Sequence, residues 1–167
     1  RVFSTSLFIH LVFSIIIIVL GETLGLWYLE NKLVIPHGRE NAAMWLYQLS
    51  IASMVMGLIN VPYQAVIIAK ERMSAFAYLS IMDVILKLLI VVILPFYPFD
   101  KLIFYGSLLF AVSVLDRLIY GWYCNRNFIE SKIKWVWDFD LFKEMVGFAG
   151  WGILGTMTYI FSNEGVN

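Results

Sequence analysis

Long apolar runs separated by short polar segments make up most of this chain. A helix needs about 20 mainly apolar residues to cross the hydrocarbon core of a bilayer, where it satisfies its own backbone hydrogen bonds. Four runs reach this length, and a shorter fifth run lies near the end of the chain. The pattern therefore predicts an all-α membrane protein with about five transmembrane helices, at Leu7–Leu29, Ala42–Ala69, Met73–Leu94, Leu102–Tyr123 and Met145–Phe161.

The segments between these runs contain residues that end helices. A short polar turn at 70–72 separates the second and third runs, and Pro95 and Pro98 follow the third. Proline lacks the backbone N–H that a helix interior requires, so we expect the third helix to stop there. The longest link, 124–143, ends in an amphipathic stretch that we expect to lie on the membrane surface.

Composition agrees with a membrane protein and narrows its chemistry. Apolar residues make up 61% of the chain and charged residues 14%, against about 45–50% and about 25% in soluble domains. Basic and acidic residues number 12 each, so no net positive field attracts nucleic acid. One cysteine and two histidines argue against a disulfide framework and against a metal site. We expect no metal, no cofactor and no nucleic-acid partner.

The distribution of Lys and Arg among the links predicts the orientation of the chain, because cytoplasmic links carry an excess of these residues. Seven lie on one side and three on the other, which places the first residue and the links 70–72 and 124–143 in the cytoplasm. The seven are Arg1, Lys70, Arg72, Arg126, Lys132, Lys134 and Lys143, and the three are Lys32, Arg39 and Lys101. The sequence begins without Met and ends just after an apolar run, so we expect an internal fragment of a longer protein.

Charged residues inside the runs are the candidate functional groups, because each costs about 2.5–3.5 kcal/mol near the centre of a span. Asp83 and Lys87 are four residues apart on one face of the third helix, and Ser80 extends the same stripe. One interpretation is a self-neutralising pair that faces other helices. The other is that Lys87 lines a central cavity and binds an anionic substrate, while Asp83 tunes it.

Asp116 and Arg117 are adjacent in the fourth run and therefore point about 100° apart. Ser113, Asp116 and Tyr120 share one face, so we expect Arg117 to reach another helix or to extend to the inner interface. Contact with a substrate phosphate is the functional alternative.

Glu22 in the first run is a candidate ion-coupling carboxylate, with Asp83 as a second candidate. The structural alternative for Glu22 is a hydrogen bond to a neighbouring helix just below the outer interface. Gly21 and Gly25 are four residues apart, a spacing that lets another helix approach closely.

Pro62 interrupts the second run and removes one backbone donor, so we expect a bend there. Asn60 and Gln64 make the same segment polar. They are candidates for the substrate pathway, and Pro62 is a candidate hinge; the alternative is a bend with a purely structural role. No phosphate-binding loop, HExxH, GxSxG or Asp-rich metal motif is present, so we expect no enzymatic activity.

Several segments together resemble a known family. They are ETLGLWYLENKLVIPHGR, YQLSIASMVMGLINVPYQAVIIAKERMSAFAYLSI, KLL, and FAGWGILG with SNEGVN. The chain resembles, over nearly all of its length, the O-antigen and capsule polysaccharide flippases of the multidrug/oligosaccharidyl-lipid/polysaccharide transporter superfamily.

The resemblance implies a MATE-like fold of two helical lobes. Residues 1–123 would supply four helices of the first lobe, 124–143 the cytoplasmic link between lobes, and 144–167 the first helix of the second lobe. It also implies a location in the bacterial plasma membrane, and it implies that this fragment alone does not transport.

The implied activity is the flipping of an oligosaccharide linked to polyprenyl pyrophosphate, by alternating access coupled to an H⁺ or Na⁺ gradient. Its partners would be this cargo, membrane lipids and other membrane proteins of polysaccharide assembly. Lys87 and Arg117 are the cations inside the runs that fit an anionic headgroup. Two alternatives remain open: a MATE-type antiporter of cationic drugs or metabolites, and a membrane-embedded enzyme of polysaccharide assembly.

Overall fold

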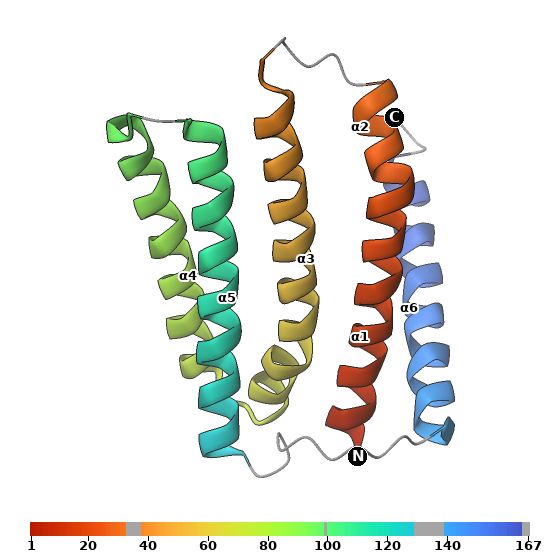
Figure 1. Cartoon of the computed structure of the whole chain (residues 1–167). Coiled ribbons are helices and arrows are strands. Elements are labelled where there is room, and N and C mark those ends of the chain that lie inside the picture. Colours follow the sequence, from red (N-terminus) through yellow and green to blue (C-terminus); the bar gives the residue numbers. More distant parts are fainter. Residues whose placement is uncertain (33–37, 99, 129–138, 165–167) are drawn as a thin grey trace.

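The computed structural model describes residues 1–32, 38–98, 100–128 and 139–164, and the elements formed by these residues are all helical (Figure 1). The first rod consists of α1, a π-helical segment and α2, which follow one another without a break. The elements are α1 (Val2–Leu20), the π segment (Gly21–Gly25), α2 (Leu26–Asn31), α3 (Glu40–Ala69), α4 (Met73–Ile93), a 3₁₀ turn (Leu94–Phe96), α5 (Lys101–Asn127) and α6 (Phe139–Glu164).

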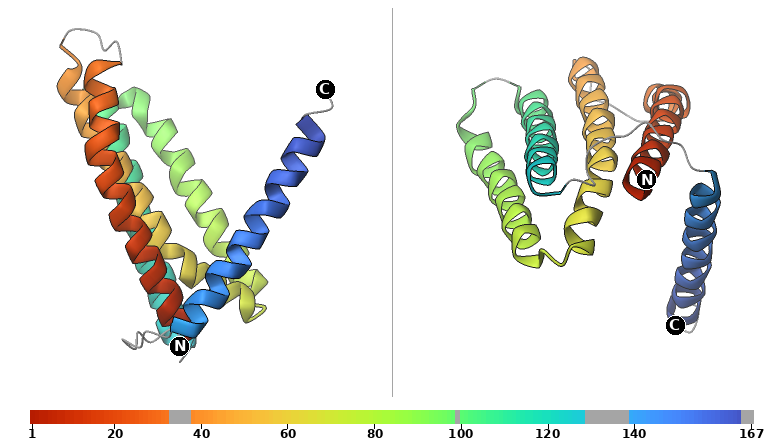
Figure 2. Two further views of the ribbon diagram at one scale, coloured as in Figure 1. Left: turned by 90° about the vertical axis from the view of Figure 1, so that its right-hand side faces the viewer. Right: turned by 90° about the horizontal axis from the view of Figure 1, so that it is seen from below.

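The helices run alternately up and down, as short links between spans require. Helices α1, α3 and α5 stand in a row, and α3 in the middle packs on both neighbours (Figure 2). Helix α4 lies against α5 at one end of the row, and α6 contacts α1 at the other. Figure 2 shows α4 and α6 diverging from the row, so the bundle is open on one side.

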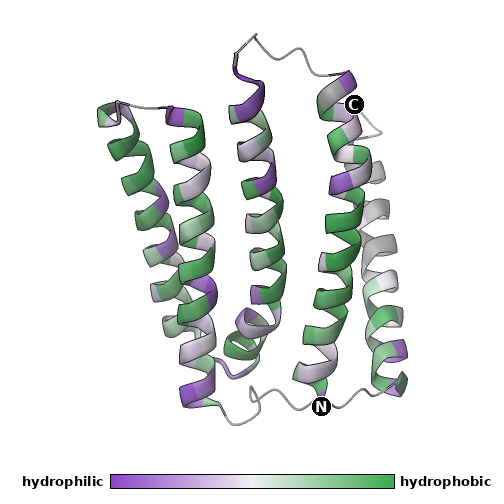
Figure 3. Ribbon diagram, viewed as in Figure 1, coloured by the Kyte–Doolittle hydropathy of each residue, from purple (hydrophilic) through white to green (hydrophobic). Residues whose placement is uncertain are grey.

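Four helical stretches are long and apolar enough to cross a membrane: Val2–Leu29, Glu40–Ala69, Met73–Phe96 and Lys101–Asn127. They confirm an all-α, multi-pass membrane protein, and their limits agree with the predicted runs to within a few residues. Helix α6 is not among the spans found in the described part of the chain, so the fifth span remains a prediction. Apolar residues cover most of the length of α1, α3, α4 and α5 (Figure 3).

Two of the links show why the chain turns where it does. The α3–α4 turn is tight: Glu71 has a φ of 55°, and the Arg72 amide donates to the Ile67 carbonyl at 3.1 Å. Pro95 ends the regular α4 helix, as expected, and the backbone passes through a 3₁₀ turn. Asp100 then caps α5, because its side chain accepts a hydrogen bond from the Leu102 amide at 3.1 Å.

The best-buried cluster lies at the end of the bundle that contains the N-terminus. It joins α1, α3 and α5 through Phe3, Leu7, Tyr63, Ile67, Tyr120, Cys124 and Phe128. The rings of Phe3 and Tyr63 meet edge to face with their centroids 5.0 Å apart. These contacts fix the three helices together at this end.

The basic residues lie at the two ends of the bundle as their links predict. Arg1, the turn 70–72, Arg126 and Lys143 belong to the end that holds the N-terminus, and Lys32, Arg39 and Lys101 belong to the other. Lys132 and Lys134, like most of the link 124–143, lie outside the described residues. Which end faces the cytoplasm stays a prediction.

Thiol labelling tests the predicted orientation. In intact cells, Arg39→Cys should react with a membrane-impermeant maleimide added outside, and Arg72→Cys should react only after lysis, because the two positions lie on opposite sides of the bilayer. The unsubstituted chain is the control, since Cys124 is fully buried. Labelling of both variants in intact cells would contradict the topology.

Candidate functional site

A polar cluster lies between α4 and α5. The Lys87 ammonium nitrogen is 2.8 Å from Asp83 Oδ2, so the predicted i, i+4 pair forms. The Lys87 side chain is 52% exposed and that of Asp83 is 24% exposed. Lys87 is thus an ion-paired cation in mid-span that is not enclosed by neighbouring side chains.

Helix α5 contributes two more groups to this cluster. The Asp116 carboxyl lies within hydrogen-bonding range of the Asp83 carboxyl and within electrostatic reach of Lys87. One turn away, the Tyr120 hydroxyl hydrogen-bonds to Ser80. The contact between the two carboxyls was not predicted, although the sequence contains a signal for it. Ser80, Asp83 and Lys87 have the same spacing as Ser113, Asp116 and Tyr120 on the next, antiparallel helix.

Arg117 points away from this cluster, toward α3. Its Nη2 donates to the Tyr63 hydroxyl at 2.9 Å, and its guanidinium carbon lies 4.0 Å from the centre of the Tyr63 ring. Gly121 makes room for it, because a Cβ there would be 2.7 Å from Arg117 Nη1. The expected divergence of Asp116 and Arg117 is confirmed, and of the proposed fates of Arg117 the structure shows contact with another helix.

The segment around Pro62 is the least exposed part of α3. The helix continues through Pro62, and its lower part turns away from the axis of the upper part (Figure 1). Asn60 is 5% exposed, and its side-chain oxygen accepts no hydrogen bond from the described residues. Gln64 is half-buried. Asn60 and Pro62 are thus buried inside the bundle, and the roles of the three residues in a pathway or a hinge remain predictions.

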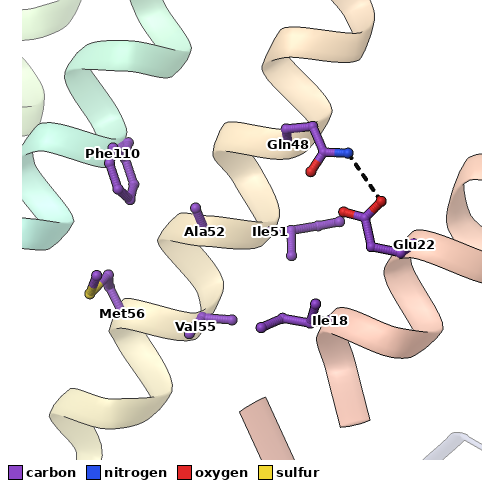
Figure 4. Close-up of a pocket in the computed structure, with 8 residues that line it drawn as sticks. All are labelled: Ile18, Glu22, Gln48, Ile51, Ala52, Val55, Met56 and Phe110. Atoms are coloured by element: carbon purple, nitrogen blue, oxygen red, sulfur yellow. Dashed lines mark hydrogen bonds between the residues drawn. The ribbon is translucent and has the colours of Figure 1, made fainter. Parts of the chain in front are cut away.

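Glu22 belongs to a second site, between the first rod and α3. Gln48 Nε2 donates to Glu22 Oε2 at 3.3 Å, which confirms the expected hydrogen bond to a neighbouring helix. The two side chains border a pocket of about 300 Å³ whose other walls are apolar (Figure 4). The lining residues are Ile18, Glu22, Gln48, Ile51, Ala52, Val55, Met56 and Phe110.

The π-helical segment that carries Glu22 was not predicted, because GETLG fits an ordinary helix equally well. A π segment interrupts the regular hydrogen-bond ladder and commonly occurs at functional sites. Here the Gly21 carbonyl accepts from the Leu26 amide and also from the Tyr47 hydroxyl of α3, the latter at 2.7 Å. The segment turns Glu22 toward Gln48 and the pocket (Figure 4).

Two glycines allow α3 to approach the π segment, as their spacing predicts. A Cβ on Gly21 would be 2.7 Å from Ile51 Cδ1, and a Cβ on Gly25 would collide with the Tyr47 hydroxyl. A larger residue at either position therefore requires Ile51 or Tyr47 to move.

In the described part of the chain, no three His, Cys, Asp or Glu residues are close enough together to hold a metal ion. Comparison of the chain with protein-family models, with curated proteins and with solved structures finds no match. The resemblance to polysaccharide flippases therefore rests on the quoted sequence segments.

Substitution of Gly25 tests the close packing that holds the Glu22 pocket. Gly25→Ala should lower the free energy of unfolding by about 1–3 kcal/mol, the usual cost of overpacking, in detergent–denaturant titrations. Gly57→Ala is the matched control, because a Cβ there meets nothing within 4 Å. The control should be neutral or stabilising. Equal stability of the two variants would contradict the packing.

Proposed function

We propose that this chain forms part of a transporter that flips a lipid-linked oligosaccharide across the bacterial plasma membrane. The cargo is carried on polyprenyl pyrophosphate and serves the synthesis of cell-surface polysaccharide. Support comes from the multi-pass helical fold and from the segments that resemble polysaccharide flippases. In this proposal residues 1–123 belong to the first of two MATE-like lobes, 124–143 to the link between lobes, and 144–167 to the second lobe.

The observation that carries the proposal is the position of Lys87. A sugar pyrophosphate is polar and anionic, so it crosses the apolar core only beside water and cations. Lys87 lies 14 residues after the start of α4, about 21 Å along the helix, and half of its side chain is exposed. A cation there is available to a headgroup in transit.

Arg117 is the second cation of the proposed pathway. Guanidinium has five N–H donors in a planar fork that matches phosphate oxygens. In the described part of the chain, Tyr63 accepts one of these hydrogen bonds and supports the face of the guanidinium. The remaining donors suit a pyrophosphate that reaches the α3–α5 interface.

Alternating access requires an energy source and a moving element. In the proposal, Glu22 or Asp83 couples transport to a gradient of H⁺ or Na⁺, and Pro62 with Asn60 and Gln64 forms the flexible wall of the pathway. The partners are the cargo, membrane lipids and other membrane proteins of polysaccharide assembly.

One observation favours an antiporter of cationic drugs or metabolites as the second candidate. Away from the ends of the spanning helices, three carboxyls, those of Glu22, Asp83 and Asp116, stand against the two cations Lys87 and Arg117. An acidic pathway attracts cations, so such an antiporter should keep its activity when Lys87 is neutralised.

The role of Lys87 is tested by flipping of a polyprenyl-pyrophosphate oligosaccharide in vesicles that contain the transporter of which this chain is part. Lys87→Gln should slow flipping about tenfold or more, because a hydrogen bond to a charged group contributes about 1.5–3 kcal/mol. Lys101→Gln, at the exposed start of α5, is the control and should leave the rate unchanged.

A double variant separates loss of cargo contact from loss of the ion pair. In Asp83→Asn/Lys87→Gln no charge at Asp83 is left unpaired, so recovery of flipping would show that Lys87 only balances Asp83. Continued slow flipping in the double variant supports contact with the cargo if Asp83→Asn alone flips at the normal rate. Unchanged flipping in the single variant would remove Lys87 from the pathway.

A further inference from the structure

The cluster between α4 and α5 has unequal charge. It contains two carboxyls, Asp83 and Asp116, but one ammonium, Lys87. Arg117, the cation next to Asp116 in the sequence, is directed toward Tyr63 on α3. With every group in its usual ionised form, the cluster carries one excess negative charge inside an apolar span, which is costly.

Each carboxyl also has one buried oxygen without a donor. The Lys87 ammonium donates a hydrogen bond to Oδ2 of Asp83. Oδ1 of Asp83 and Oδ1 of Asp116 are buried and accept no hydrogen bond from the described residues. The neighbouring polar side chains already have other hydrogen-bond partners. The side chains of Tyr120 and Ser80 are within hydrogen-bonding range of each other, and the Tyr63 hydroxyl of α3 accepts a hydrogen bond from Arg117.

We propose that Asp83 and Asp116 bind one proton between them and form a protonation site in the middle of the membrane. A single proton turns one carboxyl into a donor for the other and reduces the net charge of the cluster to zero. Two carboxylates held this close repel each other, and sharing a proton removes the repulsion. Neither carboxylate alone would need the proton, because the charge of Lys87 balances the charge of either one.

The geometry favours a proton over a metal cation. Hard cations such as Mg²⁺ and Ca²⁺ take about six to eight oxygen ligands. Around this pair the described residues offer no third carboxylate, histidine or cysteine in a ligating group. A proton needs only the two facing oxygens. The Asp83 side chain is 24% exposed, so the described residues leave it accessible to a proton.

This inference goes beyond the proposed function, since the site exists whether or not the chain moves a saccharide. The site is also separate from Glu22, which accepts a hydrogen bond from Gln48 of α3.

Infrared spectroscopy of the chain in lipid bilayers at neutral pH reports directly on the shared proton, because a protonated carboxyl has a C=O stretching band that an ionised carboxylate lacks. No cargo or transport is involved in this measurement.

The band of the protonated pair should disappear in both Asp83→Asn and Asp116→Asn, because the remaining carboxyl is balanced by Lys87. Asp140→Asn is the matched control, since Asp140 is exposed at the start of α6 and outside the spans. It should leave the band unchanged. Lys87→Gln should enlarge the band up to about twofold, because the pair then loses its only cation.

Three results would overturn the proposal. They are absence of the band in the unsubstituted chain, its persistence in either asparagine variant, and its loss when sodium is added at constant pH. Circular dichroism checks the helix content of each variant. If an asparagine variant fails to fold, the band of the unsubstituted chain and its growth in Lys87→Gln still decide the question.

Discussion

The structure depends on one constraint: a polar group on a spanning helix must find its partner on the protein, because lipid offers none. Away from the ends of the described spans, the charged residues meet this constraint in three places. Asp83, Lys87 and Asp116 join α4 to α5, Arg117 joins α5 to Tyr63 of α3, and Glu22 joins the first rod to Gln48 of α3. Helices in a membrane associate through close packing and through polar contacts, and these polar contacts help to select which faces meet.

The spans could be predicted from the sequence because hydrophobic length alone determines them. The directions of adjacent charges also follow from helix geometry, as Asp116 and Arg117 show. What could not be predicted is pairing between helices, because many registers place one polar residue opposite another. The Asp83–Asp116 contact follows only once α4 and α5 are known to be antiparallel neighbours. The contact that joins the π segment at Glu22 to α3 comes from Tyr47, which is 26 residues from its acceptor Gly21.

The polar contacts differ in their exposure, and this difference connects structure to function. Arg117 donates a hydrogen bond to Tyr63, whose side chain is 2% exposed, so this contact between α5 and α3 is buried. Lys87 is half exposed, and its partner Asp83 also lies next to Asp116. In the proposed pathway, the charged group on α4 is therefore more accessible than Arg117 on α5.

Thiol accessibility at position 87 tests most directly whether water reaches the middle of α4. Lys87→Cys in bilayers should react rapidly with a charged, lipid-insoluble thiol reagent. Ile85→Cys, two residues and about 200° around the helix, should react slowly, because its exposed side chain then faces lipid. Equal, slow reaction at both positions would show that Lys87 is surrounded by lipid or protein, and would contradict a hydrated pathway along α4.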